Sequence, residues 1–514
     1  MNYDIFKNKR VCLFIPHQDD EINIAYGLLY TIKDIAKDIK VVYSTNGNYV
    51  VNEKYRLKEG IKSLEKIGIK KSNIIFMGYS DQIPEGKTHI YHEKELWIDS
   101  FNNSSTKTPY DNDYHYLKTG KHAQFNRKNF EFDIKSIIEE TYPEVIITVD
   151  FDSHPDHRAL SLSIERVLGE ILKKNNKYQP ILLKSFAYPT SYKGYDDFGY
   201  NNKNTRFLLE ENSYSKMQNP YYKWSDRIMF KNHKKGTSYL FLKNIYFYGL
   251  LEHKSQYILN RINQIINNDL VFFERNTKNL LLNAKQIKTS SGNPNYLNDF
   301  MLFDSSNILG GVTRKIELDE GFTILEKNDK EKRIDIVFNT KVNINIIKIY
   351  IKPETSKNIK KISILVNGVS KEYEVKYDNN IYTLKDLNIV EAKELSILIN
   401  CNENIHIGEL ELLHQEERIN YALLEINGDV HNDYYSSIPP KVGIISNVDY
   451  SNLRIKKENN KVQLYKDSQL IDTIILHKEN KLKLMIIKKI NDILLLLGRV
   501  YQKIIKIVRK LAAK

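Results

Sequence analysis

The run Val11-Cys12-Leu13-Phe14-Ile15-Pro16-His17-Gln18-Asp19-Asp20-Glu21 passes from an apolar segment into a histidine and three acids. Its first five residues are apolar without interruption, which is typical of a strand buried on both faces of a parallel sheet. Apolar residues with helical spacing follow and predict a helix: Ile22, Ala25, Leu28, Leu29 and Ile32. The acids therefore fall in a strand-to-helix turn and the first turn of a helix, where the helix dipole favours negative charge.

A second cluster, His154-Pro155-Asp156-His157, has the same setting. It follows the apolar run 145–149, a second buried strand, and precedes a predicted helix over about 158–173. In open α/β sheets, ligands bind outside the carboxyl ends of the strands. The two clusters are therefore expected to converge, although His17 and His154 are 137 positions apart.

Together the clusters contain the residues of a metal-assisted hydrolase. Catalytic zinc needs three protein ligands and an open position for water, and His17, Asp20 and His157 would supply the ligands. Asp19 would point elsewhere and could accept the proton of the water. His154 and His157 flank a proline, so that one could bind metal while the other faces substrate. Each cluster alone is equally typical of a solvated helix start or a cap.

These residues resemble the zinc-dependent PIG-L (LmbE-like) de-N-acetylases, whose motifs are His-Pro-Asp-Asp-Glu and His-x-Asp-His. The resemblance covers about the first 280 residues. Gln18 stands where the family usually has proline, and Asn48 stands where an acid is frequent. Further similar segments are Ser44-Thr45-Asn46-Gly47, Arg56 with Glu59, Leu64, Gly68, the strand and loop 74–81, and His253-Lys254-Ser255-Gln256.

The resemblance implies a Rossmann-like, doubly wound, mostly parallel sheet and a deacetylation with one Zn²⁺ ion as cofactor. Zinc would polarise an acetamide carbonyl and lower the pKa of its bound water. Asp19 would be the general base. His154 would stabilise the oxyanion or protonate the leaving amine, with Asp156 tuning it.

The resemblance also suggests substrate contacts. Arg56 and Asp81 would be candidates for binding substrate hydroxyls or phosphate. The alternatives are that Arg56 and Glu59 form a surface helix pair at i,i+3 and that Asp81 is an ordinary loop acid. The aromatic segment 220–224 could stack on sugar rings, although Tyr and Trp more often fill cores.

At 514 residues the chain is long enough for two or more domains. Strand-like alternation with short turns from about residue 300 predicts a β-sandwich, vaguely similar to discoidin-like, galactose-binding jelly rolls. It could bind carbohydrate or serve as a spacer. The predicted division is a deacetylase domain (1–280), a linker (281–299), the jelly-roll-like β-sandwich (300–415), a further β-rich region (416–477) and a basic amphipathic helix (478–514).

The net charge of +13 lies mostly in this last segment. Residues 478–514 carry a net charge of +9, which leaves +4 for the other 477 residues. Apolar residues recur there with a helical period and lysines and arginines lie between them, a pattern typical of a helix in an anionic membrane interface. A partner-docking or oligomerisation helix is the alternative. Nucleic acid is not expected as a partner, because no reader module is recognisable.

Two cysteines, Cys12 and Cys401, both in apolar strand contexts, exclude a disulfide framework. No apolar signal region follows Met1, and no run of 18 apolar residues occurs. The sequence therefore predicts a cytoplasmic protein, peripheral on the inner face of the membrane.

The sequence predicts a zinc-dependent hydrolase that removes the N-acetyl group from an amino sugar in a glycan, glycolipid or cell-surface polysaccharide precursor. One alternative is a zinc amidase acting on a non-glycan N-acyl substrate, such as a thiol-sugar conjugate. Another is a catalytically silent glycan-binding scaffold, against which the intact acids and histidines argue.

Overall fold

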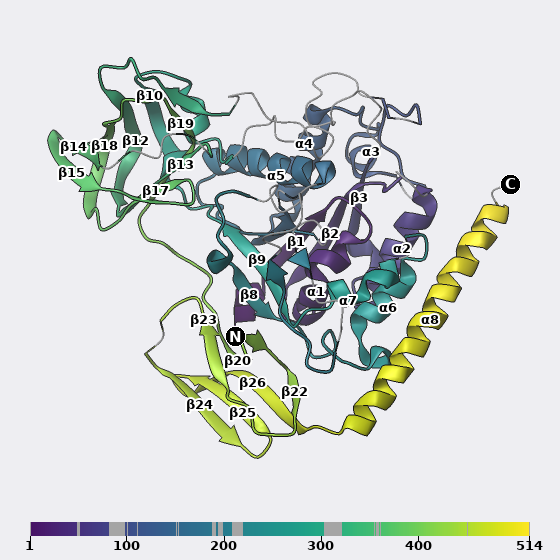
Figure 1. Cartoon of the computed structure of the whole chain (residues 1–514). Helices are drawn as coiled ribbons and strands as arrows, with labels where there is room; N and C mark the ends of the chain where they lie inside the picture. The colour runs from purple at the N-terminus through teal and green to yellow at the C-terminus, as the bar shows by residue number, and fades with distance from the viewer. Residues whose placement is uncertain are drawn as a thin grey trace.

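A seven-stranded sheet organises the N-terminal part of the chain (Figure 1). Its strand order is β3-β2-β1-β4-β5-β9-β8; the first five strands are parallel, and β9 and β8 are antiparallel additions. The strands are β1 (Arg10–Ile15), β2 (Asp38–Thr45), β3 (Ile74–Tyr79), β4 (Val145–Val149), β5 (Ile181–Ser185), β8 (Ile228–Lys231) and β9 (Asp269–Arg275). The computed structural model describes residues 2–48, 52–81, 98–99, 101–109, 112–150, 152, 154–187, 192–193, 199–207, 219–256, 258–302, 321–353, 355, 359, 361–449 and 451–512.

Helices connect these strands and cover the sheet. The predicted helix after the second cluster is α5, which begins at Pro155 with His154 as its N-cap. The first cluster leads into a π-helical turn, η2 (Glu21–Ala25), which continues as α1. The helices are α1 (Tyr26–Ile32), α2 (Glu53–Lys66), α3 (Tyr114–Thr119), α4 (Arg127–Thr141), α5 (Pro155–Lys174), α6 (Ile245–Glu252) and α7 (Ile262–Ile265). Short 3₁₀ turns are η1 (Asn2–Phe6), η3 (Lys71–Asn73), η5 (Trp224–Asp226), η6 (Phe241–Lys243) and η7 (Ile258–Arg261), and a two-residue pair joins β6 (Tyr192–Lys193) to β7 (Arg206–Phe207).

The two apolar runs of the sequence form adjacent central strands. Val11 of β1 pairs with Val145 of β4, and Phe14 pairs with Thr148. Both strands are almost wholly buried, as continuous apolar runs predict for strands covered on both faces. Strand order reverses at β1, which lies between β2 and β4, so the chain has the doubly wound arrangement in which ligands bind at the switch point.

A β-sandwich follows the sheet domain, and its strands are antiparallel throughout. Its two five-stranded sheets have the orders β10-β12-β18-β14-β15 and β11-β19-β13-β17-β16 and enclose one apolar core. The strands are β10 (Ala284–Thr289), β11 (Thr323–Leu325), β12 (Lys332–Ile344), β13 (Ile346–Ile351), β14 (Lys361–Val366), β15 (Val369–Glu374), β16 (Lys376–Asp378), β17 (Ile381–Leu384), β18 (Ile389–Ile399) and β19 (Ile405–Leu413).

The segment 281–299, predicted as a linker, contributes to this sandwich. It contains β10, whose Ile287 pairs with Ile336 of β12, together with the turns η8 (Leu280–Asn283) and η9 (Pro294–Leu297). β10 is an edge strand with mostly exposed side chains. An edge strand of this kind needs few apolar residues, which explains its polar composition.

The region 416–477 has a small apolar core of its own, formed between a three-stranded sheet, β21-β20-β23, and a four-stranded sheet, β22-β26-β25-β24. Its strands are β20 (Ala422–Ile426), β21 (Asp429–Val430), β22 (Asp433–Ser436), β23 (Gly443–Ser446), β24 (Leu453–Glu458), β25 (Lys461–Lys466) and β26 (Gln469–Lys478). This region is called the C-terminal β-module below.

The chain ends in one long helix, α8 (Lys481–Ala512), which runs along the side of the sheet domain (Figure 1). Asn491 and Gln502 are buried on its docked face, where they hydrogen-bond to Tyr239 and Leu250. Within the described residues, no helix is long and apolar enough to cross a membrane.

Candidate active site

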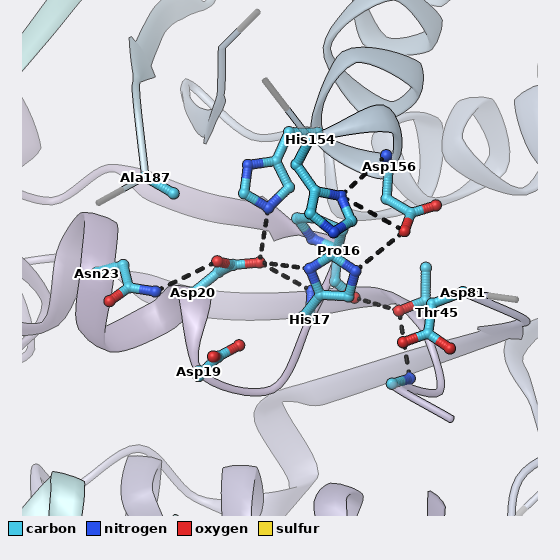
Figure 2. Close-up of polar contacts among 12 residues, drawn as sticks. Pro16, His17, Asp19, Asp20, Asn23, Thr45, Asp81, His154, Asp156 and Ala187 are labelled. Atoms are coloured by element: carbon cyan, nitrogen blue, oxygen red, sulfur yellow. Dashed lines mark hydrogen bonds and ion pairs between the residues drawn. The ribbon is translucent and has the colours of Figure 1, made fainter. Parts of the chain in front are cut away.

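The two acid-and-histidine clusters meet at the carboxyl ends of β1 and β4. Oδ2 of Asp20 lies 3.1 Å from Nδ1 of His17 and 3.4 Å from Nε2 of His157. The His17 backbone N–H also donates to Oδ2 of Asp20, at 3.0 Å, which fixes the carboxylate within its own turn. The convergence that the sequence predicts is therefore present, and Figure 2 shows His17 between Asp20 and Asp156.

The spacing of these donor atoms suits a small metal ion. Ligands about 2.0–2.1 Å from a tetrahedral zinc ion lie roughly 3.3 Å from one another. The contacts of Asp20 with His17 and His157 are close to that separation, and all three residues are buried. Two imidazoles and one carboxylate form a donor set that zinc accepts in catalytic sites.

His154 also belongs to this group. One ligand atom from each of His17, His154 and His157 lies within 4.8 Å of the others, so these histidines could also hold an ion. The ring of His154 lies 4.6 Å from that of His17 and 4.8 Å from that of His157, between ring centroids. The side chain of His154 is 43% exposed, however, whereas those of His17 and His157 are about 5% exposed. His154 therefore lies on the open side of the cluster.

Two further carboxylates surround the histidines. Oδ2 of Asp152 lies 2.6 Å from Nδ1 of His157, and Oδ2 of Asp156 lies 3.1 Å from Nε2 of His17. Carboxylates of this kind orient ligating histidines and increase their basicity. Asp156 was singled out in the sequence, but Asp152 was not. Its position two residues before His154 was the available signal, and its contact with His157 depends on the tertiary structure.

The pKa shifts within the cluster favour the charged forms of its groups, namely protonated His17 and His157 and ionised Asp20. Burial opposes protonation of His17, but its hydrogen bonds with Asp156 and Asp20 raise its pKa to about 9. Burial likewise opposes charge on His157, yet Asp152 and Asp20 raise the pKa of this ring well above its ordinary value. Despite burial, His157 and His17 hold the pKa of Asp20 well below its ordinary value. Three buried carboxylates around two imidazoles are an environment that a divalent cation would neutralise.

His154 has the opposite behaviour. Although its side chain is 43% exposed, desolvation by the surrounding protein, together with His17 and His157, lowers its pKa to about 3, so the ring is neutral. The backbone N–H of Asp156 donates to Nδ1 of His154 at 3.2 Å. Nδ1 therefore accepts, and the hydrogen of this neutral ring resides on Nε2, which can donate to another group.

Asp19 lies apart from the Asp20 carboxylate and has a different partner (Figure 2). Its Oδ1 accepts a hydrogen bond from Nη2 of Arg56 at 3.2 Å. Nη1 of Arg56 donates to the Gly47 carbonyl at 3.2 Å and lies 3.7 Å from Oδ2 of Asp81. Burial raises the pKa of Asp81 to about 6, although His17 and Arg56 oppose the shift. Arg56 and Asp81, predicted as substrate contacts, thus adjoin the candidate base.

The residues that depart from the family pattern have structural partners. Nε2 of Gln18 donates to the Thr45 carbonyl at 2.7 Å, joining the turn after β1 to the end of β2. Oδ1 of Asn48 accepts from the Ser80 hydroxyl and the Asp81 backbone N–H, each at 3.1 Å. Asn48 therefore orders the loop that carries Asp81.

Gly47 allows this close arrangement. Its φ is +62°, and a Cβ at this position would come within 2.3 Å of Oε1 of Gln18 and 2.5 Å of Cδ of Arg56. Only glycine combines this backbone conformation with this contact distance. The loop after β2 can thus hold Arg56 against the turn that carries Asp19.

The segment His253–Gln256 supports the turn after β1 that carries Asp19 and Asp20. His253 Nε2 lies 2.7 Å from Oε1 of Glu21, and Nε2 of Gln256 donates to the Gln18 carbonyl at 2.6 Å. The Ser255 backbone N–H and hydroxyl both donate to the carboxylate of Glu59. The sequence indicated this segment through the family resemblance, and its contacts give it a structural role.

Comparison with known proteins agrees with this geometry. Residues 12–168 match the family model PIG-L, described as GlcNAc-PI de-N-acetylase. This part of the chain is therefore similar to a PIG-L domain. The match supports a deacetylase activity for the domain, and the resemblance inferred from the motifs is confirmed. No match was found among curated proteins.

Several solved structures are similar to parts of the chain, including two that are described as deacetylases. The zinc-inhibited form of teicoplanin deacetylase Orf2 is 12% identical, with 52% of this chain and 97% of that chain covered and a TM-score of 0.28. N,N'-diacetylchitobiose deacetylase from Pyrococcus horikoshii is 17% identical, with 35% and 60% covered and a TM-score of 0.23. CpGH89CBM32-6 from Clostridium perfringens is 16% identical, with 26% and 98% covered and a TM-score of 0.18.

Proposed function

We propose that this protein is a zinc-dependent N-deacetylase that removes the acetyl group from an N-acetylated amino sugar in a glycan, glycolipid or polysaccharide precursor. The observation that carries the proposal is the position of Asp20, whose Oδ2 contacts histidines from two separate clusters while Asp19 remains separate for proton transfer. The PIG-L match over residues 12–168 supports the same reaction.

The residues present fit one zinc ion. His17, Asp20 and His157 would hold it, with His154 at the open side as the donor nearest to substrate. Bound zinc would supply Lewis-acid chemistry, polarising the acetamide carbonyl and lowering the pKa of a water molecule.

Asp19 would take the proton from the attacking water and return it to the leaving amine. A general base must be held within hydrogen-bond reach of the proton it takes. Arg56 fixes the carboxylate of Asp19 through its 3.2 Å hydrogen bond and is itself anchored on the Gly47 carbonyl. The role of Arg56 is therefore to position the base, and Asp81, which faces the same guanidinium, would contact substrate hydroxyls.

His154 would donate a hydrogen bond to the oxygen that becomes negative during the attack. Its lowered pKa keeps it neutral, and the Asp156 backbone N–H leaves the ring hydrogen on Nε2. A preorganised donor at a developing oxyanion typically contributes about 10²–10³-fold to kcat. The Asp156 carboxylate, 3.6 Å from Nδ1 of His154, would tune this ring.

The decisive experiment measures acetate release. The full-length protein, loaded with zinc, is incubated with N-acetylglucosamine attached to lipid, polyol or oligosaccharide, and both acetate and the free amine are quantified. Equimolar acetate and amine are expected from at least one acceptor class. Release of a different acid from other N-acyl substrates, with no acetate from any amino sugar, would assign the site to another amidase reaction.

We further propose that α8 rests on an anionic membrane surface. Opposite its docked face, α8 presents a stripe of apolar side chains that are between 46% and 64% exposed: Leu482, Met485, Ile486, Ile493, Leu496, Leu497, Val500, Ile504, Ile507 and Val508. Lysines and arginines border the stripe, among them Lys488, Arg499 and Lys506. This combination of a wide apolar face and basic flanks suits a helix lying in the interface plane.

A further inference from the structure

A pocket of about 370 Å³ lies where the sheet domain, the C-terminal β-module and the start of α8 meet. Figure 1 shows α8 starting a short connection after the C-terminal β-module. The pocket shares no lining residue with the candidate metal centre. Its volume falls in the range of about 300–1,000 Å³ that is typical of small-molecule sites.

Four lysines from three elements line the pocket. Lys234 and Lys235 come from the loop after β8, Lys243 from η6 and Lys483 from α8. In the described part of the chain, none of these four ammonium groups forms an ion pair. The carboxylate in the lining, Asp433, is already held by His477 at 2.6 Å. Lysines therefore outnumber carboxylates in the lining by four to one, and Glu479 adds a carboxylate beside the pocket, where it accepts a hydrogen bond from the Tyr200 hydroxyl.

A neighbouring histidine responds to this charge. His233 lies directly before Lys234, and burial lowers its pKa, with Lys234, Lys235 and Lys33 adding to the effect. Lys234 and Lys235 thus act together on this ring, and the four lysines of the pocket are exposed to solvent.

The walls of the pocket are aromatic and well anchored. The rings of Tyr200 and Tyr239 are 6.0 Å apart and those of Tyr200 and Tyr435 are 5.9 Å apart, both edge to face. The Tyr435 backbone exchanges hydrogen bonds with the Asn201 side chain, and Asn491 of α8 holds the Tyr239 carbonyl. Each wall is therefore fixed across a junction between elements, and the site is preformed.

We propose that this pocket binds a phosphate ester of a small polyol. Lysine is a common phosphate ligand as a point charge, and several lysines match the charge of a phosphate better than that of a single carboxylate. Tyrosine faces suit the sugar or polyol that carries the phosphate.

The source of the phosphate ester is expected to be a membrane lipid. Lys483 and Ile487 of α8 line the pocket, and Leu482, Met485 and Ile486 of the same turns are exposed. A helix whose apolar face enters a bilayer would bring the pocket to the depth of the lipid headgroups. A soluble sugar phosphate has the same binding chemistry and must be distinguished by experiment.

The test uses full-length protein and two probes. The first is glycerol 3-phosphate in calorimetric titration. The second is co-sedimentation with phosphatidylcholine vesicles that contain either phosphatidic acid or oleic acid at equal surface charge. The variant K234Q/K235Q/K243Q/K483Q is compared with the control K285Q/K288Q/K327Q/K330Q, which removes the same charge from exposed positions on the β-sandwich. Unchanged melting temperatures establish that both are folded.

Wild type and control are expected to bind glycerol 3-phosphate and to prefer phosphatidic acid over oleic acid by about ten-fold or more, and the pocket variant is expected to lose both properties. Binding of glycerol 3-phosphate that depends on the four lysines, without any vesicle preference, would retain the site and make its ligand a soluble phosphate ester. Equal behaviour of pocket variant and control, or no binding of either probe by wild type, would overturn the proposal.

Discussion

At the scale of single residues, Asp20 joins the two clusters. It belongs to the turn after β1, yet its Oδ2 reaches His157 on α5 as well as His17 in its own turn. Asp19, its neighbour in sequence, is held by Arg56 instead. Two adjacent carboxylates thus have different surroundings, which allows one to bind metal and the other to transfer protons.

Replacing Asp20 with alanine is expected to abolish zinc binding. Only two of the three proposed ligands, His17 and His157, would remain, and the carboxylate that both of them contact would be absent. Zinc content by elemental analysis, after dialysis at neutral pH, should fall to background while the melting profile of the metal-free protein persists. D34A, which removes an exposed acid, is the control. Full zinc occupancy in D20A would refute this ligand assignment and favour the three-histidine set.

Replacing Asp19 with asparagine is expected to preserve zinc content and lower turnover by about 10²–10⁴-fold, since an amide cannot accept the proton of water. Acetate release at saturating substrate measures the effect. A rate near that of wild type would assign the base to another group, with His154 the first to test.

A buried acid far from the chemistry should make stability depend on pH. Burial raises the pKa of Asp269 from 3.8 to about 6, although its Oδ1 accepts from the Thr205 backbone N–H and hydroxyl. The folded state therefore retains a proton that the unfolded chain releases. The stability that this provides is present below about pH 4 and is lost as the pH rises through 6.

The variant D269N cannot titrate but retains the acceptor for Thr205. Its melting temperature is expected to match that of wild type at about pH 4 and to exceed it at about pH 7. Differential scanning calorimetry across this interval is the measurement. If the difference in melting temperature between D269N and wild type is the same at every pH from about 4 to about 7, the raised pKa of Asp269 is contradicted.

At the scale of elements, α8 has two faces with different surroundings, one docked on the sheet domain and one exposed. Its docked face contributes polar anchors, and Nη1 of Arg509 lies 2.7 Å from Oε1 of Glu59 on α2. Glu59 in turn accepts from Ser255, next to the catalytic turn. The helix therefore completes the support of the site while its opposite face remains uncovered by the described chain.

Removing part of the exposed stripe should separate membrane binding from folding. The variant L482S/I493S/L496S is expected to lose partitioning onto anionic vesicles by about ten-fold or more, because each exposed side chain loses apolar transfer energy. The control V369S/V390S/I438S changes exposed apolar residues elsewhere and should bind as wild type. Truncation after His477 should abolish binding. Wild-type protein that ignores anionic vesicles would identify α8 as a partner-docking helix.

The sequence was most informative where one physical signal dominated. The buried strands 11–15 and 145–149 and the helix after His154 were predictable from apolar runs and a proline at a helix start. β10 was not, because an edge strand has little apolar content. The contact of Asp152 with His157 was not predictable either, since its carboxylate is one of many acids until the turn after β4 brings it to the ring.

At the scale of the whole molecule, a buried charged pair crosses the boundary between the sheet domain and the β-sandwich. Arg275, at the end of β9, forms a buried ion pair with Glu411 of β19, and Tyr350 donates to the other carboxylate oxygen of Glu411 at 2.9 Å. Both charged side chains are about 2–3% exposed. Removing one partner would leave the other charge buried and uncompensated.

The variant R275M is therefore expected to lose about 3–5 kcal/mol of stability, the usual effect of breaking a buried pair from one side. The control K361M removes one partner of an exposed pair with Glu372 and should leave stability almost unchanged, because solvent screens that pair. Calorimetry with both variants gives the comparison. A small effect in R275M would mean that Glu411 protonates or gains water at little free-energy cost.

The contact between Arg509 and Glu59 has a consequence for protein synthesis, because it joins residues 450 positions apart. Translation at about 5–20 residues per second separates the emergence of η7, which ends at Arg261, from that of Gly498 by roughly 12–47 s. During that interval the surface of α6 and η7 that later receives Gly498, including Leu251 and Leu259, has no helix to cover it. The nascent sheet domain would then expose an apolar strip until the last helix of the chain is made.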